Sequence, residues 1–140
     1  MISIYSTVKK KGVSEKTIKE LVSFILKQSK VHGDVSVHFI GDTKMKRLNK
    51  QYRGKEYSTD VLSFAQQEGE WITPTEDLGD IFISVPYIRA QAKRFDVSYR
   101  EESMRMLVHG LLHLLGHDHQ KEKEAQQMYQ LQEQYIKKFL

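Results

Sequence analysis

Hydrophobic and polar residues follow one another along the chain with two different periods. Short runs in which apolar residues alternate with polar ones, or continue without interruption, predict β-strands. Apolar residues three and four positions apart predict amphipathic helices. The expected strands cover residues 2–5, 34–41, 61–64 and 78–85, and the expected helices cover residues 15–30, 43–52, 86–95, 99–115 and 121–139.

Residues near the helix ends support these boundaries. Ser14 is a suitable N-cap for the first helix, and Asp42 or Thr43 is one for the second. Ser98 and Glu101 have the spacing of a capping box at the start of the fourth helix. The residues expected to face the core are Met45, Leu48 and Tyr52 in the second helix, and Ala125, Met128, Leu131, Tyr135 and Ile136 in the last.

Strands and helices do not alternate regularly, and this order predicts an α+β fold. We expect a single small mixed β-sheet of about four strands, with about five helices packed on it. The strand at 78–85 is expected at the centre of the sheet and the strand at 61–64 to be buried. The polar segment between them is expected to form a hairpin with its tip near Gly69. A length of 140 residues predicts one domain, residues 1–140.

The composition excludes several classes of protein. Hydrophobic residues make up 39% and charged residues 29% of the chain, which is typical of a soluble globular protein. No apolar run approaches the ~20 residues of a membrane span. The chain has no cysteine, so we expect no disulfide partner, and a cytoplasmic location is compatible with this. The formal net charge of +4 favours an anionic partner.

The segment HGLLHLLGHDH, residues 109–119, holds four of the six histidines. His109 and His113 are one helical turn apart and project from the same face of the predicted helix. Gly116 can end this helix in a left-handed conformation, so that the chain folds back and the His119 side chain can approach those of His109 and His113. Three imidazoles can hold one divalent metal ion and leave a position open for water. Without thiolate ligands they favour Zn²⁺, and the sequence predicts a zincin-like metal helix.

Other residues of this segment define the chemistry around the predicted ion. Asp118 is expected either to orient a ligand imidazole or to act as a turn carboxylate. His117 is expected to face solvent or to assist a ligand rather than to bind the ion. Gly110 stands where zinc peptidases carry the glutamate that acts as general base. A peptidase would therefore lack its main proton acceptor here.

Three blocks of the sequence together resemble the YbeY family of bacterial rRNA-maturation endoribonucleases. They are LNKQYRGKEYSTDVLSF (48–64), LGDIFIS (78–84) and the histidine segment, in this order along the chain. The chain departs from the family pattern at Ser58 and Ala65, where the family often has proline. Both positions affect loop geometry, so they weaken the details of the loop rather than the resemblance.

The resemblance implies a site and a function. It implies a metal ion held by His109, His113 and His119, and an essential arginine that corresponds to Arg53. It implies cleavage of single-stranded RNA in 16S rRNA 3′-end maturation and in ribosome quality control. The implied partners are the rRNA of the small ribosomal subunit, the ribosome and ribosome-maturation factors.

The residues around Arg53 suit an RNA substrate. Positions 44–55 contain six basic residues: Lys44, Lys46, Arg47, Lys50, Arg53 and Lys55. A guanidinium group keeps its charge and can bind phosphate through two parallel hydrogen bonds, so Arg53 is the candidate catalytic residue. Lys46, Arg47, Lys50 and Lys55 are candidates for binding the RNA backbone, with an exposed helix face as the alternative interpretation.

Two other functions stay open on the sequence. The first is another zinc metallohydrolase, including a peptidase, and Gly110 argues against it. The second is a non-enzymatic ribosome-assembly factor with a structural metal. The open coordination position and Arg53 argue against this second function.

Overall fold

The computed structural model describes residues 1–8, 12–65, 77–117 and 121–139. In the described residues the elements are β1 (Ile2–Ser6), α1 (Glu15–Gln28), β2 (Asp34–Ile40), α2 (Asp42–Arg53), β3 (Val61–Ala65), β4 (Asp77–Ser84), α3 (Val85–Arg94), α4 (Tyr99–Leu114) and α5 (Glu122–Phe139). The four strands form one mixed sheet in the order β1-β2-β4-β3. The predicted α+β fold is therefore confirmed.

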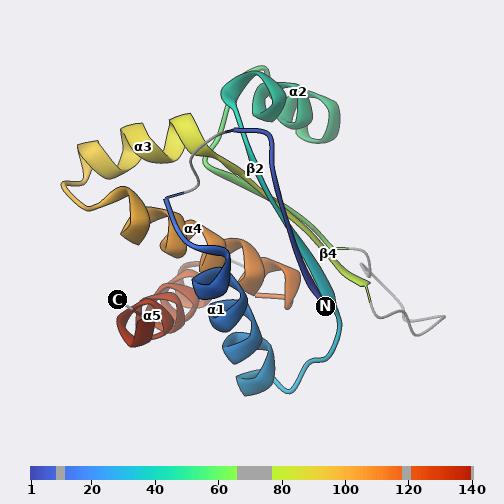
Figure 1. Ribbon diagram of the computed structural model, residues 1–140, viewed down its shortest axis with the longest axis vertical. Helices are drawn as coiled ribbons and strands as arrows, with labels where there is room; N and C mark the ends of the chain where they lie inside the picture. The colour runs from blue at the N-terminus through green and yellow to red at the C-terminus, as the bar shows by residue number, and fades with distance from the viewer. Residues whose placement is uncertain (9–11, 66–76, 118–120, 140) are drawn as a thin grey trace.

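The sheet has one face that is covered by helices. β1, β2 and β4 run parallel, whereas β3 runs antiparallel to β4. Helices α1, α4 and α5 lie together on one side of the sheet (Figure 1). Alternate residues of β2 and β4, such as Val37 and Ile81, point to this side and belong to the same buried cluster as Leu107 and Leu111 of α4. The main core therefore lies between the sheet and α4.

The middle of the sheet agrees with the prediction, and its edge does not. β4 lies between β2 and β3, so the strand expected at the centre is central. β3 is an edge strand among the described residues, in which Leu62 is buried and the other residues are partly buried. The strand expected over residues 61–64 is therefore confirmed, but it is partly buried rather than buried. The antiparallel pairing of β3 with β4 agrees with a hairpin, but the tip expected near Gly69 lies outside the described residues.

Helix α2 packs on the opposite face of the sheet, at one end (Figure 1). Its Met45 is fully buried against Ile40 and Leu62. Tyr52 is expected to face the core, but it is 59% exposed, because it lies on the last turn of α2, where its ring packs on Phe64 at the edge of the sheet.

The start of α2 also differs from the prediction. Gly41, in extended backbone conformation, is the N-cap, and neither Asp42 nor Thr43 caps the helix. The Asp42 carboxylate instead accepts hydrogen bonds from the hydroxyl groups of Ser58, at 2.9 Å, and Ser84, at 2.8 Å. This carboxylate therefore ties α2 to the loop before β3 and to the end of β4.

Helix α4 begins and ends as the sequence predicts. The Ser98 hydroxyl accepts a hydrogen bond from the Glu101 N–H at 3.0 Å. At the other end Gly116 has a φ of +95°. Its N–H donates to the His113 carbonyl, and the His117 N–H donates to the Leu112 carbonyl, each at 3.0 Å. This is a Schellman motif, and it turns the chain away from the helix axis at Gly116, after the C-cap Leu115.

None of the described helices has both the length and the apolar character that crossing a bilayer requires.

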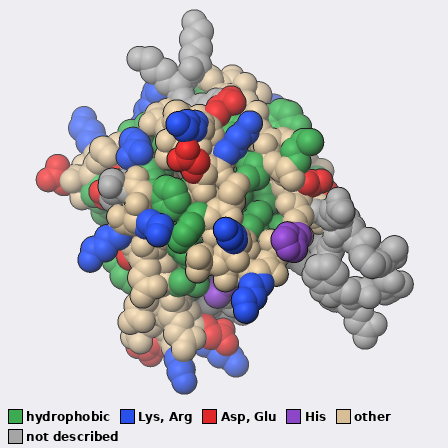
Figure 2. Space-filling model, turned by 60° about the horizontal axis from the view of Figure 1, so that its bottom comes forward, with side chains coloured by type: hydrophobic (Ala, Val, Ile, Leu, Met, Phe, Trp, Pro, Cys, Tyr) green, Lys and Arg blue, Asp and Glu red, His purple; other side chains and the backbone are tan. Residues whose placement is uncertain are grey.

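Figure 2 shows the molecule turned so that the bottom of Figure 1 comes forward. On this side, basic side chains are dispersed among acidic and hydrophobic ones.

Candidate functional site

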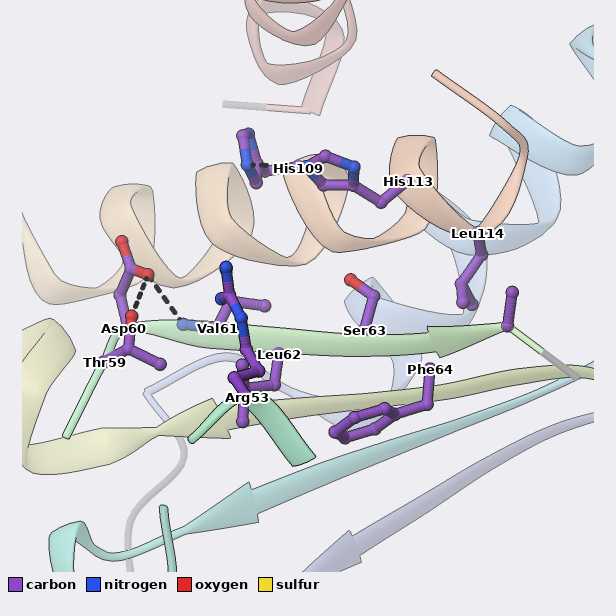
Figure 3. A pocket seen from close by; sticks show the side chains of 11 residues that line it. Arg53, Thr59, Asp60, Val61, Leu62, Ser63, Phe64, His109, His113 and Leu114 are labelled. Atoms are coloured by element: carbon purple, nitrogen blue, oxygen red, sulfur yellow. Dashed lines mark hydrogen bonds between the residues drawn. The ribbon is translucent and has the colours of Figure 1, made fainter. Parts of the chain in front are cut away.

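An open pocket of about 500 Å³ lies between α4 and the edge strand β3 (Figure 3). Residues 59–65 form one wall, and His109, His113 and Leu114 of α4 form the other. Arg53, the last residue of α2, completes the lining. The structure thus brings three of the residues singled out in the sequence, Arg53, His109 and His113, to one cavity.

Gly110 allows α4 to approach the sheet this closely. A Cβ atom at this position would lie 2.8 Å from Cγ2 of Ile81, and 3.2 Å from both Oγ of Ser63 and Cγ2 of Val61. Real side chains do not tolerate the first of these separations, so a larger residue would push α4 away from β3 and β4. The glycine next to His109 therefore sets the width of the pocket.

The imidazole rings of His109 and His113 lie next to each other in the pocket. Their Nε2 atoms are 3.2 Å apart, and their rings meet nearly edge to face, with centroids 4.8 Å apart. Two nitrogen ligands at 2.0–2.1 Å from a tetrahedral Zn²⁺ ion are separated by about 3.3 Å. The spacing of these two nitrogens therefore fits two ligands of one ion.

A glutamine on α5 orients His109. The side-chain carbonyl of Gln132 accepts a hydrogen bond from Nδ1 of His109 at 2.9 Å. In a neutral imidazole this leaves the lone pair on Nε2, the nitrogen that faces His113. Gln132 is only 5% exposed, so its amide is held in place by the packing of α5 on α4.

Gln132 is not among the residues predicted from the sequence, which offered Asp118 or His117 as the orienting residue. A signal was present, because Gln132 lies on the same helical stripe as Met128 and Ile136, one turn from each. A polar residue in the middle of a buried stripe needs a partner inside the protein. The partner, twenty-three positions earlier in the chain, could not be identified from this pattern alone.

An ion-pair network fixes α5 against α4 next to this contact. The Arg105 guanidinium donates to both carboxylate oxygens of Glu133, at 2.9 and 3.0 Å, and to Glu102 at 3.0 Å. The hydrogen bonds with Glu133 raise the pKa of Arg105 above its usual value, and those from Arg105 lower the pKa of Glu133. Glu133 also accepts from the Gln132 amide at 3.3 Å. The network therefore holds the segment that positions His109.

Local structure places Arg53 at the rim of the pocket. Gly54, with a φ of +68°, ends α2 directly after it. The buried Asn49 side chain donates to the Tyr57 carbonyl at 2.7 Å and holds the following loop against the helix. Arg53 is exposed, and Figure 3 shows its side chain crossing β3 toward the space between β3 and α4.

Thr59 and Asp60 fix the loop that leads into β3. One Asp60 carboxylate oxygen accepts hydrogen bonds from the Val61 N–H at 2.7 Å and from the Thr59 hydroxyl at 3.3 Å (Figure 3). Both residues also line the pocket. Their contacts hold the wall of the pocket in shape.

The remaining candidates lie around the pocket or beyond the described residues. Lys46, Arg47, Lys50 and Lys55 are exposed, and none of these four described side chains lines the pocket. Lys50 forms a 3.5 Å ion pair with Glu56, and the Lys55 ammonium lies 5.9 Å from the centre of the Tyr57 ring.

His117 is exposed after the turn at the end of α4, while Asp118 and His119 lie outside the described residues. Within the described ranges no three His, Cys, Asp or Glu side chains are grouped so that they could hold a metal ion. The predicted third ligand therefore stays a prediction.

Comparison with known proteins shows to which class of enzyme and to which family this chain belongs. The profile described as "Endoribonuclease YbeY" matches residues 3–140, which places the chain among the endoribonucleases, enzymes that hydrolyse RNA phosphodiester bonds. The chain belongs to the YbeY family, and the resemblance inferred from the three sequence blocks is confirmed.

Individual relatives support this assignment over nearly the whole chain. "Endoribonuclease YbeY" of Persephonella marina is 42% identical over 126 residues, which are 89% of this chain and 82% of the relative. The protein of the same name from Sulfurihydrogenibium sp. is 38% identical over 139 residues, 98% of this chain and 91% of the relative. The solution structure of TM1509 from Thermotoga maritima matches with a TM-score of 0.71 and 28% identity, covering 99% of this chain and 89% of that one.

Proposed function

We propose that this chain is a single-strand-specific, metal-dependent endoribonuclease whose active site is the pocket between α4 and β3, and that residues 1–140 form its one domain. The observation that carries the proposal is the convergence of Arg53, His109 and His113, from two separate elements, on one open cavity. Membership of the YbeY family supplies the substrate, RNA.

His109 and His113, with His119 as the third ligand, are the residues that would hold the metal ion. When bound, a divalent ion there acts as a Lewis acid and lowers the pKa of water. Zn²⁺ is the ion we propose, because imidazole suits it and the chain has no cysteine. Gln132 acts on this site by fixing the orientation and the tautomer of His109.

Arg53 is the proposed catalytic residue. Its guanidinium keeps its charge at the rim of the pocket and can donate two parallel hydrogen bonds to the oxygens of a phosphodiester. Negative charge grows on these oxygens as the attacking oxygen adds to phosphorus, so Arg53 stabilises the transition state more than the bound substrate. Either water or the RNA 2′-hydroxyl is the attacking group.

The resemblance to the family extends the proposal to a cellular role. We propose that the substrate is rRNA of the small ribosomal subunit in the cytoplasm, processed at the 16S 3′ end on or near the ribosome. The exposed Lys46, Arg47, Lys50 and Lys55 are the proposed contacts to the RNA backbone.

An assay on defined oligonucleotides tests the proposed activity. The purified protein is expected to cleave single-stranded RNA and to leave the same sequence intact in a duplex, because a phosphodiester must reach the pocket beside Arg53. Product ends distinguish the nucleophiles: attack by the 2′-hydroxyl leaves a cyclic phosphate, and attack by water does not. Equal cleavage of both RNA forms would contradict single-strand specificity.

Metal content tests the proposed ligands. We expect close to one divalent ion per wild-type chain, and binding that weakens as the pH falls through about 6.5, because imidazole must be neutral to bind a metal. His119→Ala is expected to lose the ion and His117→Ala to keep it. Gln132→Leu is expected to weaken binding about 10- to 100-fold, because an orienting partner is lost. Elemental analysis and competition with a chelator measure these effects, and full retention by His119→Ala would contradict the ligand set.

Salt dependence tests the proposed backbone contacts. The affinity for single-stranded RNA is expected to fall with salt, with a log–log slope of about −0.7 per phosphate neutralised. Lys46→Ala and Lys50→Ala should each make this slope shallower and lower the affinity modestly for every sequence. Lys16→Ala, which changes an exposed lysine on α1, is the control and should change neither value. An affinity independent of salt would contradict recognition of the backbone.

A further inference from the structure

We propose that the face of the sheet opposite α4 binds single-stranded RNA, with a base stacked on the exposed end of a row of aromatic side chains that crosses the sheet to the edge beside the pocket. The row consists of Tyr5, His38, Phe82, Phe64 and Tyr52 and is called the aromatic row below. The proposal rests on the proposed function for the identity of the polymer, and it adds a second binding surface to it.

Helices α1, α4 and α5 cover one face of the sheet (Figure 1), and the aromatic row lies on the other face. Along each strand, neighbouring side chains point to opposite faces. Val37 and Phe39 point to the main core, so His38 points away from it, and Phe82 does so between Ile81 and Ile83. In the described part of the chain, α2 covers one end of this face, through Met45 and Leu48.

The rings of the row contact one another across all four strands. Tyr5 of β1 stacks on His38 of β2, with centroids 5.0 Å apart and planes 18° apart, and His38 stacks on Phe82 of β4 at 4.3 Å and 12°. Phe82 meets Phe64 of β3 edge to face at 5.8 Å, and Phe64 meets Tyr52 of α2 at 4.9 Å. Pairing in register of Tyr5, His38 and Phe82 aligns the first three rings.

Stabilisation of the sheet explains only part of this row. Aromatic pairs on neighbouring strands add about 0.2–1 kcal/mol each, which accounts for the inner rings. Tyr5 and Tyr52, at the two ends, are 54% and 59% exposed and contribute little to a core. Tyr5 stacks on His38 with one face and lies on β1, the outermost strand of the described sheet. The stack therefore ends on an exposed ring that another planar ring can extend.

The aromatic row ends at β3, the strand that also forms a wall of the pocket. The Phe64 ring lies on the side of β3 away from α4 (Figure 3), so the row and the pocket meet at the edge of this strand. Tyr52 directly precedes Arg53 at the end of α2. Three inter-strand spacings of roughly 4.8 Å separate Tyr5 from β3, so the row covers about 14 Å before the pocket begins. One strand of RNA that passes round the edge of β3 can therefore reach both places.

Charge and chemistry favour RNA over a protein partner. The exposed lysines and arginine of positions 44–50 lie on α2, which overhangs one end of the row, and they attract phosphate. Every nucleobase has a π-face that can stack on an aromatic ring, whatever the sequence. Polar groups lie within the row, because Nε2 of His38 is hydrogen-bonded to the Asp80 carboxylate at 2.9 Å. A surface with such polar groups suits the edges of bases better than a purely apolar surface does.

Binding of labelled RNA of two lengths tests the proposal. Fluorescence anisotropy is measured on the purified full chain at low temperature, and a gel verifies that the RNA is intact. For single-stranded RNA of about twelve nucleotides, Tyr5→Ala should weaken binding about 5- to 100-fold, because one stacked base is lost. For RNA of about three nucleotides, which fills only the pocket, Tyr5→Ala should bind as the wild type does. Tyr5→Phe should retain the wild-type affinity for both lengths.

Tyr129→Ala is the matched control, because Tyr129 is 61% exposed and lies on α5, on the covered side of the sheet. It should leave the affinity for both RNA lengths unchanged. Equal affinity of Tyr5→Ala and the wild type for the longer RNA would overturn the proposal, and a protein would then be the candidate partner of this face. Binding that depends on Tyr5 without any RNA cleavage would support the surface while rejecting the proposed nuclease.

Discussion

Gly110→Glu is expected to lower the free energy of unfolding by at least about 3 kcal/mol. The new side chain would begin with a Cβ atom 2.8 Å from Cγ2 of Ile81, which is fully buried in the sheet. It would also place a carboxylate between α4 and β3, where the Val61 and Ser63 side chains already fill the space. Urea unfolding followed by circular dichroism measures the loss.

Two smaller substitutions serve as references for the loss of stability expected in Gly110→Glu. Gly110→Ala adds only the Cβ atom and should cost less than Gly110→Glu. Gly54→Ala is the control for backbone strain, because Gly54 has a φ of +68° and no atom within 4 Å of an added Cβ atom, and it should cost about 1 kcal/mol. Wild-type stability of Gly110→Glu would contradict the close packing of α4 on the sheet.

Arg53→Ala is expected to reduce the rate of RNA cleavage by on the order of 10²–10³ under single-turnover conditions, because one preorganised donor to the transition state is lost. The fold and the metal content should not change, since Arg53 is exposed at the end of α2 and is not one of the proposed ligands. Arg53→Lys should restore little activity, because an ammonium cannot reproduce two parallel hydrogen bonds.

Lys50→Ala is the matched control, since Lys50 is exposed on the same helix one turn earlier. At saturating enzyme it should cleave at nearly the wild-type rate, because its proposed contact affects binding of the RNA backbone only. Cleavage by Arg53→Ala at the wild-type rate would remove Arg53 from the catalytic step. A loss of metal from Arg53→Ala would instead assign it a structural role.

Local patterns predicted most of the fold. The stripe Ile18, Leu21, Val22, Ile25 and Leu26 is fully or almost fully buried on α1, as its spacing predicts. The alternation of β2 and the capping by Ser14 and Ser98 are also confirmed. These features depend on neighbours within a few residues, and such neighbours are visible in the sequence.

The errors all involve partners that are distant in the sequence. Asp42 could cap α2, but its carboxylate binds Ser58 and Ser84 instead. Tyr52 has the spacing of a core residue, yet α2 lies over the edge of the sheet, so the ring is exposed. Helical periodicity cannot show what a helix packs against, and these two predictions depended on that.

The candidate site was predicted in part. Spacing alone placed His109 and His113 on one face of a helix, and the structure has both rings in the pocket. That Arg53 lies there as well depended on the family resemblance, because no local pattern relates the end of α2 to α4. Gly110 was interpreted through the glutamate it lacks, whereas the structure gives it a second role as the contact point of α4 with the sheet.

The most direct test of the proposed function compares wild-type protein with His113→Ala, purified identically, on single-stranded RNA and on an unstructured polypeptide. We expect wild-type protein to cleave the RNA and not the polypeptide, and His113→Ala to cleave neither. Equal RNA cleavage by both samples would show that a contaminant is responsible. Hydrolysis of the polypeptide by the wild type alone, with the RNA left intact, would contradict the ribonuclease and indicate a peptidase.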